Sequence, residues 1–320
     1  MNAAGAGGVA AIAVAVQIAL VGVGAPLLGG LMRKVRCRME GRAGPPLRQP
    51  LRELRKLVRR ERLRPEHTSW VYGAAPLVLV ATSVVVAGVA PIVTTRSPLA
   101  GGADLFAIVY LLLLGSLFLG LAGLDSGTAF GGMGASRALT LGALAEPALL
   151  VAILALAVPA HSSSLPVIIH GTLRHPGWAI GPARVLALAA FVVVVLAESG
   201  RLPFDNPSTH LELTMIHEAM VLEYAGPDLA LVTASEQIRT AVLLGLLMTV
   251  FVPWGVATSS APLAFVWGAI TLTAKVAGAG VALAAFEVVT AKLRLFRLPE
   301  LLAAAFVAAT LSVLVALVTA

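Results

Sequence analysis

The chain has 320 residues, of which 58% are hydrophobic and only 12% charged, with a mean hydropathy of +0.93. Soluble domains carry about 25% charged residues, so this composition excludes a soluble globular protein. Cys37, the one cysteine, excludes an internal disulfide and cannot alone hold a structural zinc or an iron–sulfur cluster. We therefore predict no metal site in this chain, so that any metal centre used in its function belongs to a partner.

The net charge of +7 is unevenly distributed, since 13 of the 23 Lys and Arg residues lie between Arg33 and Arg64. In a soluble protein this cluster would indicate a nucleic-acid partner. Between apolar spans it instead indicates a cytoplasmic topology signal that faces lipid headgroups. We therefore expect membrane lipids, and no nucleic acid, as partners of this segment.

The first apolar span covers about residues 9–32. Its N-terminal flank carries no positive charge and no cleavage site follows it, which favours a membrane span over a cleaved signal peptide. Residues 33–66 form a basic cytoplasmic segment. Within it Leu51, Leu54, Leu57 and Val58 recur at helical spacing between Arg and Lys residues, which predicts a short amphipathic helix on the membrane surface.

Seven further segments are long and apolar enough to cross a bilayer. They cover about residues 70–93, 104–124, 138–158, 178–198, 238–257, 261–289 and 300–319. The fold class is therefore all-α, with about eight transmembrane helices in a single integral membrane domain of residues 1–320. The glycines at 131–134 follow no strand and precede no Lys-Ser/Thr pair, so we expect a tight turn there rather than a phosphate loop.

Eight spans place both termini on one side of the membrane. Nineteen Lys and Arg residues then fall on the opposite side, against three on the side of the termini. This bias predicts a multi-pass membrane protein with both termini on the outer side. No internal repeat is visible, which argues against a stand-alone transporter.

The segment 198–228 is then a cytoplasmic acidic loop between the fifth and sixth spans. It contains six carboxylates: Glu198, Asp205, Glu212, Glu218, Glu223 and Asp228. So many carboxylates beside a bilayer are costly and point to a functional loop. Thr209 and Glu212 have capping-box spacing, which predicts a helix over about 210–224. The alternative is an interfacial helix that only packs on the spans.

His217-Glu218 begins like the helical motif of zinc proteases, but Val221 stands where the second histidine is required. We therefore expect His210 and His217 to be satisfied interfacial histidines.

Three ionisable residues within the predicted spans are proton-path candidates: Glu146, Lys275 and Glu287. Glu146 precedes Pro147 inside the fourth span, where a charged carboxylate costs about 3 kcal/mol and desolvation favours its neutral form. Glu146 is thus a candidate proton relay, or else a neutral residue bonded to another span. Lys275 and Glu287 lie twelve residues apart, roughly 18 Å along a helix, so each needs another partner. Glu287 is a proton-path candidate or a salt-bridge partner of Arg294 or Arg297.

Four motifs resemble a known family. They are Glu-Ser-Gly-Arg-Leu-Pro-Phe-Asp-Asn-Pro at 198–207, Met-Gly-Ala-Ser-Arg at 133–137 with Ala-Glu-Pro at 145–147, Gly-Pro-Pro-Leu-Arg-Gln-Pro at 44–50, and Ala-Lys-Leu-Arg-Leu-Phe-Arg-Leu-Pro at 291–299. The chain resembles subunit 4 of formate hydrogenlyase, the membrane anchor of group 4 [NiFe] hydrogenases. That family belongs with subunit 1 of complex I, the NADH–quinone oxidoreductase.

Seven residues fit the complex I pattern of the acidic loop: Glu198, Arg201, Pro203, Phe204, Asp205, Pro207 and Glu212. Gly200 replaces the family's Asn, while Ser208 and His210 replace two glutamates. About three extra residues precede Glu223. These departures favour the hydrogenase branch over the corresponding subunit of a quinone-reducing NADH dehydrogenase, which is the alternative, and argue against a bound quinone.

The resemblance implies a protein of the prokaryotic cell (inner) membrane that has no catalytic residue and no cofactor of its own. Its partners would hold the redox centres. A hydrogenase small subunit-like protein would carry an iron–sulfur cluster above the acidic loop, a large subunit-like protein would hold a nickel–iron site, and antiporter-like membrane subunits would move ions. The acidic loop would couple electron transfer to proton movement through Glu146, Lys275 and Glu287. Docking would involve five arginines: Arg42, Arg48, Arg137, Arg294 and Arg297. A passive anchor without a coupling role is the remaining alternative.

Overall fold

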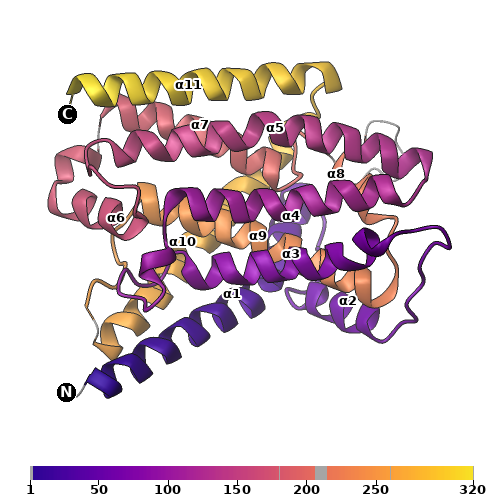
Figure 1. Ribbon diagram of the computed structural model, residues 1–320, viewed down its shortest axis with the longest axis horizontal. Helices are drawn as coiled ribbons and strands as arrows, with labels where there is room; N and C mark the ends of the chain where they lie inside the picture. The colour runs from indigo at the N-terminus through magenta and orange to yellow at the C-terminus, as the bar shows by residue number, and fades with distance from the viewer. Residues whose placement is uncertain (1–2, 180, 206–214, 260, 320) are drawn as a thin grey trace.

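The computed structural model describes residues 3–179, 181–205, 215–259 and 261–319. Long helices run side by side, with both termini at one end of the molecule (Figure 1). They are α1 (Ala3–Met39), α3 (Trp70–Val89), α4 (Leu105–Asp125), α5 (Ala129–Ala157), α7 (Pro182–Glu198), α9 (Gly226–Phe251), α10 (Pro262–Val289) and α11 (Leu298–Thr319). The shorter ones are α2 (Gln49–Val58), α6 (Leu165–Arg174) and α8 (His217–Val221), with 3-10 turns η1 (Ala100–Gly102), η2 (Pro176–Ala179) and η3 (Leu295–Arg297).

The all-α polytopic membrane fold is confirmed. Among the described residues, seven helices are long and apolar enough to cross a membrane. The fifth expected span, α7, has 17 residues, which is the lower end of the length that spans a bilayer. The count of about eight is therefore close.

Two helices begin earlier than the apolar pattern predicts. The sequence predicts a tight turn at the glycines 131–134, but they lie inside α5, and the turn is made by Gly127 at a φ of +68°. Gly131 and Gly134 instead allow close packing, because a Cβ on Gly134 would lie 2.6 Å from that of Ala219 in α8. The prediction failed since glycine serves turns and helix contacts alike.

The helix α9 begins at Gly226 rather than near residue 238. Gly226 has a φ of +58°, and a Cβ there would lie 2.2 Å from the carbonyl oxygen of Glu61. Hydropathy did not predict this start, because the first half of α9 is polar. Asp228, expected in the loop, therefore lies on this helix and is buried.

The predicted short amphipathic helix is α2, which lies at the end opposite the termini and packs against α1 and α9 (Figure 1). Its buried residue is Pro50. The acidic loop contains a described helix only at His217–Val221, where the sequence predicted one over about 210–224. Thr209, His210 and Glu212 lie outside the described residues.

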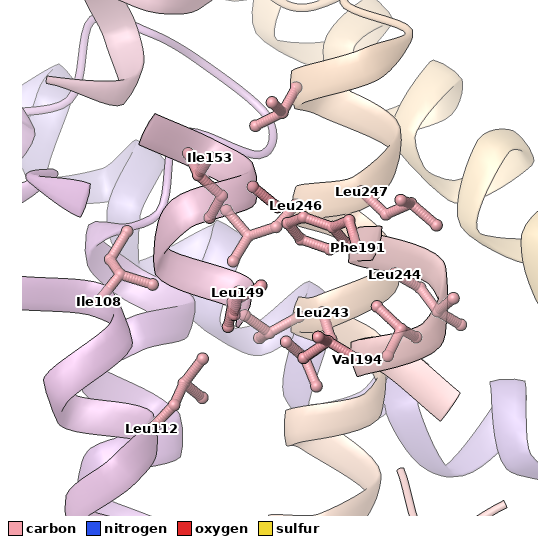
Figure 2. Packing of buried hydrophobic residues seen from close by; sticks show 14 of the residues in the cluster. Ile108, Leu112, Leu149, Ile153, Phe191, Val194, Leu243, Leu244, Leu246 and Leu247 are labelled. Carbon is pink, nitrogen blue, oxygen red and sulfur yellow. The ribbon is translucent and has the colours of Figure 1, made fainter. Parts of the chain in front are cut away.

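The hydrophobic core draws residues from all the long helices, and α4, α5, α7 and α9 meet at its centre. Figure 2 shows Leu149 and Ile153 of α5 facing Phe191 of α7 and Leu243 of α9. The rings of Phe191 and Phe251 meet edge to face with centroids 5.7 Å apart. In lipid, such interhelical packing takes the place of the hydrophobic effect in holding helices together. This core fixes the helices that carry the candidate site.

Candidate functional site

Two cavities lie where the acidic loop meets the helix bundle. The first, called here the loop cavity, has a volume of about 430 Å³ and lies between α1, α8, α9 and the start of the acidic loop. The second, the inner cavity, has a volume of about 390 Å³ and lies between α4, α5, α8 and α9. Five residues line both cavities: Ser199, Gly200, His217, Glu236 and Thr240. These residues form the wall between the cavities.

Asp205 anchors the acidic loop. Its side chain is buried, and its Oδ2 accepts hydrogen bonds from the backbone N–H groups of Ile216 (3.0 Å) and His217 (3.1 Å). Its Oδ1 lies 3.4 Å from Nζ of Lys292, in the linker before α11. Asp205 therefore connects the start of the loop, the short helix α8 and the basic linker.

Glu146 and Glu198 both line the inner cavity. Glu198 accepts a hydrogen bond from Arg239 of α9, and both side chains of this pair are about nine-tenths buried. Glu146 of α5 is 7% exposed, and its Oε1 has no hydrogen-bond partner among the described residues. A buried carboxyl group in this position is expensive to ionise unless a neighbouring group or water supplies a hydrogen bond.

Glu287 does not pair with Arg294 or Arg297, so this salt-bridge alternative was wrong in its partners. Its Oε1 lies 3.1 Å from Nη1 of Arg201, and its Oε2 lies 3.9 Å from Nη1 of Arg36. The pair joins the end of α10 to the acidic loop and to α1. Sequence spacing favoured the nearby arginines, whereas the fold brings Arg201 from 86 residues away.

Lys275 finds its partners on another element, as its distance from Glu287 required. Its Nζ donates hydrogen bonds to the carbonyl oxygens of Val252, at 2.6 Å, and Trp254. These carbonyls follow the end of α9, where backbone acceptors have no helical partner. Lys275 thus lies apart from the two cavities and from Glu146.

The other loop carboxylates are held by the protein. Glu223 accepts a hydrogen bond from Thr128 at the start of α5. Asp228 is 2% exposed and pairs with Arg62, at 2.9 Å, and Arg64, at 3.5 Å. Glu218 lines the loop cavity. Of the acidic segment, therefore, the described carboxylates are bound to the bundle or face a cavity, while Glu212 lies outside the described residues.

The five predicted docking arginines lie on different segments, except for Arg294 and Arg297, which lie at the two ends of η3. Arg42 pairs with Glu40, and Arg137 donates a hydrogen bond to the carbonyl oxygen of Met215 at 3.3 Å. Arg48 precedes α2, and Arg294 and Arg297 are exposed beside η3. Their docking role stays a prediction.

His217 and Glu236 were missed as functional candidates. His217 was expected to be satisfied, and its Nε2 does lie 2.7 Å from Oε1 of Glu236. Desolvation lowers the pKa of His217, but the charge and hydrogen bond of Glu236 outweigh this effect and raise it to about 9. The imidazole is therefore charged at neutral pH. Glu236 was overlooked because it stands alone in the polar first half of α9, which hydropathy does not mark as part of a span.

The fold and these contacts define a polytopic membrane protein with buried charged residues around two cavities. The chain belongs to the NADH dehydrogenase family, whose model matches residues 11–319. This membership confirms the resemblance seen in the sequence motifs.

Relatives place the chain more narrowly. It is 38% identical over 230 residues to hydrogenase-4 component C of Escherichia coli (strain K12), with 72% of this chain and 71% of the relative covered. It is 32% identical to formate hydrogenlyase subunit 4 of the same organism, with 88% and 91% covered. A subunit of the NADH-quinone oxidoreductase of Syntrophotalea carbinolica (strain DSM 2380 / NBRC 103641 / GraBd1) is 30% identical, with 68% and 69% covered.

A solved structure shares the fold. It is a chain of the membrane-bound sulfane sulfur reductase, an archaeal respiratory membrane complex. The TM-score is 0.81 at 20% identity, with 96% of this chain and 99% of that chain covered. The relatives are membrane subunits of multi-subunit hydrogenase or respiratory complexes, so partner subunits are implied for this chain as well.

Proposed function

We propose that this chain is the membrane anchor and energy-coupling subunit of a complex I-related, group 4 hydrogenase-type complex. The observation that carries the coupling role is the buried Glu146, whose Oε1 lacks a hydrogen-bond partner among the described residues and whose cavity also holds the Glu198–Arg239 pair. Intramembrane ionisable residues that face a cavity mark proton or ion pathways. A passive anchor needs no such residue.

The redox centres belong to the partners in this proposal. An iron–sulfur protein like the hydrogenase small subunit, together with a large subunit-like protein, docks at the end of the bundle where α2 and α8 lie. Antiporter-like subunits join the chain within the membrane. This end faces the cytoplasm of a prokaryotic cell, and both termini lie outside, because the basic segment 33–66 is found at the α2 end.

The loop cavity supports this reading over quinone reduction. Seven of its lining residues carry ionisable side chains: Arg33, Arg36, Glu53, Arg201, His217, Glu218 and Glu236. Small-molecule sites are lined mainly by apolar and aromatic side chains. The lining of the loop cavity fits water and protons better than an isoprenoid quinone.

The test is Glu146→Gln in the complete complex, purified from its host and reconstituted into liposomes. We expect electron transfer and subunit content to persist while proton translocation per electron falls. Glu300→Gln, at the exposed start of α11, is the matched control. Unchanged translocation in Glu146→Gln with an intact complex would favour the passive anchor.

A further inference from the structure

The wall between the two cavities contains one pair of titratable side chains in direct contact. His217 of α8 and Glu236 of α9 both line the loop cavity and the inner cavity. We propose that this His217–Glu236 pair is the proton-transfer contact between the two cavities. This inference rests on the proposed function and adds to it the residues through which protons reach the inner cavity.

Geometry supports the transfer. The 2.7 Å between Nε2 of His217 and Oε1 of Glu236 lies within the range in which general acids and bases exchange protons. The other three residues of the wall, Ser199, Gly200 and Thr240, offer hydroxyl groups or no side chain at all. Within the described wall, the pair is therefore the route that carries titratable groups on both sides of the contact.

The proton balance is simple. The pair rests as imidazolium and carboxylate, because the charge of Glu236 favours protonated His217. When the Nε2 proton moves to Oε1 of Glu236, an N–H bond breaks and an O–H bond forms. Glu236 then releases that proton into the inner cavity, and the neutral imidazole takes a replacement from water in the loop cavity. One proton enters and one leaves, with no change in redox state.

Two further charged groups act on His217 besides Glu236. Glu218, on the same short helix, favours the imidazolium, whereas Arg239 of α9 disfavours it. Arg239 is itself bound to Glu198 in the inner cavity. A change in the Glu198–Arg239 pair would therefore alter the proton affinity of His217. The state of the inner cavity would then affect proton transfer through the His217–Glu236 contact.

The position of His217 depends on the acidic loop. Its backbone N–H donates to Oδ2 of Asp205, and Asp205 also contacts Lys292. Its Cβ lies 3.5 Å from the site of a Cβ built on Gly200, which has a φ of +57°. A partner that displaces Asp205 or Lys292 would move the imidazole relative to Glu236 and change the contact between them. The His217–Glu236 contact thus lies where a docked redox subunit could change its geometry.

The experiment compares His217→Gln, His217→Ala and Glu236→Gln in the complete complex reconstituted into liposomes. We expect each variant to transfer electrons while proton translocation per electron falls by about a hundredfold, the lower end of what a positioned acid–base group contributes. Added imidazole should restore translocation in His217→Ala, which a purely structural role would not permit. His67→Gln, at an exposed position before α3, is the control and should match the native complex.

The outcomes separate this proposal from the one it rests on. If Glu146→Gln loses translocation while both His217→Gln and Glu236→Gln retain it, the proton-transfer role of the His217–Glu236 pair is overturned and the coupling role stands. If Glu146→Gln also retains translocation, the coupling role is overturned, and so is the proton-transfer role of the His217–Glu236 pair. If imidazole fails to restore an assembled His217→Ala complex, the transfer role is overturned. Should His217 variants not assemble, Glu236→Gln decides the same question from α9.

Discussion

Arg201 and Glu287 form an ion pair of 3.1 Å between the acidic loop and the last turns of α10. Glu287 is 4% exposed, and Arg36 of α1 approaches its other oxygen at 3.9 Å. A buried carboxylate between two guanidinium groups holds three distant segments together. The acidic loop is therefore fastened to the bundle by charge at its first residues, close to the wall between the cavities.

Removing Glu287 should destabilise the protein. Glu287→Ala leaves two arginines without their carboxylate, and breaking a buried pair costs roughly 3 kcal/mol. Partial exposure of both arginines reduces this cost. Thermal unfolding of the detergent-solubilised chain should show a lower midpoint. The double variant Arg201→Ala/Glu287→Ala should lose less than the sum of the single losses, because the residues interact. Strict additivity would contradict the pairing.

Asp205→Asn should loosen α8. The substitution removes the charge that holds Lys292 and weakens the acceptor for two backbone N–H groups, at a cost of about 1 kcal/mol as for a lost helix cap. We expect faster hydrogen exchange at the amides of Ile216 and His217, measured by mass spectrometry. Glu61→Gln, at an exposed site, serves as the comparison. Equal exchange in both variants would show that Asp205 does not hold α8.

The His217–Glu236 pair predicts a pH dependence of stability. The pKa of His217 is raised in the folded protein to about 9, from about 6.5 in an unfolded chain. The folded state therefore binds more protons in this window, and stability falls as pH rises. The contribution is complete below about pH 6.5 and is lost as pH passes through about 9. Its signature is the difference between native and His217→Gln unfolding midpoints, which should shrink from about pH 6 to about pH 10. A constant difference would contradict it.

Gly134→Ala tests the packing of α8 on α5. The new Cβ would meet the Cβ of Ala219 at 2.6 Å and the carbonyl oxygen of Ile216 at 3.0 Å. Overpacking of this kind costs about 1–3 kcal/mol, and here it would also displace the wall between the cavities. Gly132→Ala, two residues away in open space, is the matched control and should be neutral or stabilising. A lower unfolding midpoint only for Gly134→Ala is the expected result.

Candidate residues differ in how far the sequence could reveal them. Glu146 stood out because a carboxylate inside an apolar span is rare, and the structure buries it beside a cavity. Glu236 gave no such signal, since the polar turns around it resembled a loop. Glu287 pairs with Arg201 from 86 residues away, and Asp205 with Lys292 from 87 residues away. Hydropathy or local spacing carries no information on such contacts.

Composition and apolar run length alone determined that this is an all-helical membrane protein, because lipid forces the backbone of each span to bond within itself. The four motifs determined its family, because each repeats the order of residue types that the family shows at that place. The tertiary structure decided where the described loop charges go: it buried Glu198, Asp205 and Asp228 in ion pairs. It also started α5 and α9 earlier than their apolar stretches, and set His217 against Glu236 between two cavities. Those outcomes depend on close approach between distant segments, which a one-dimensional pattern does not encode.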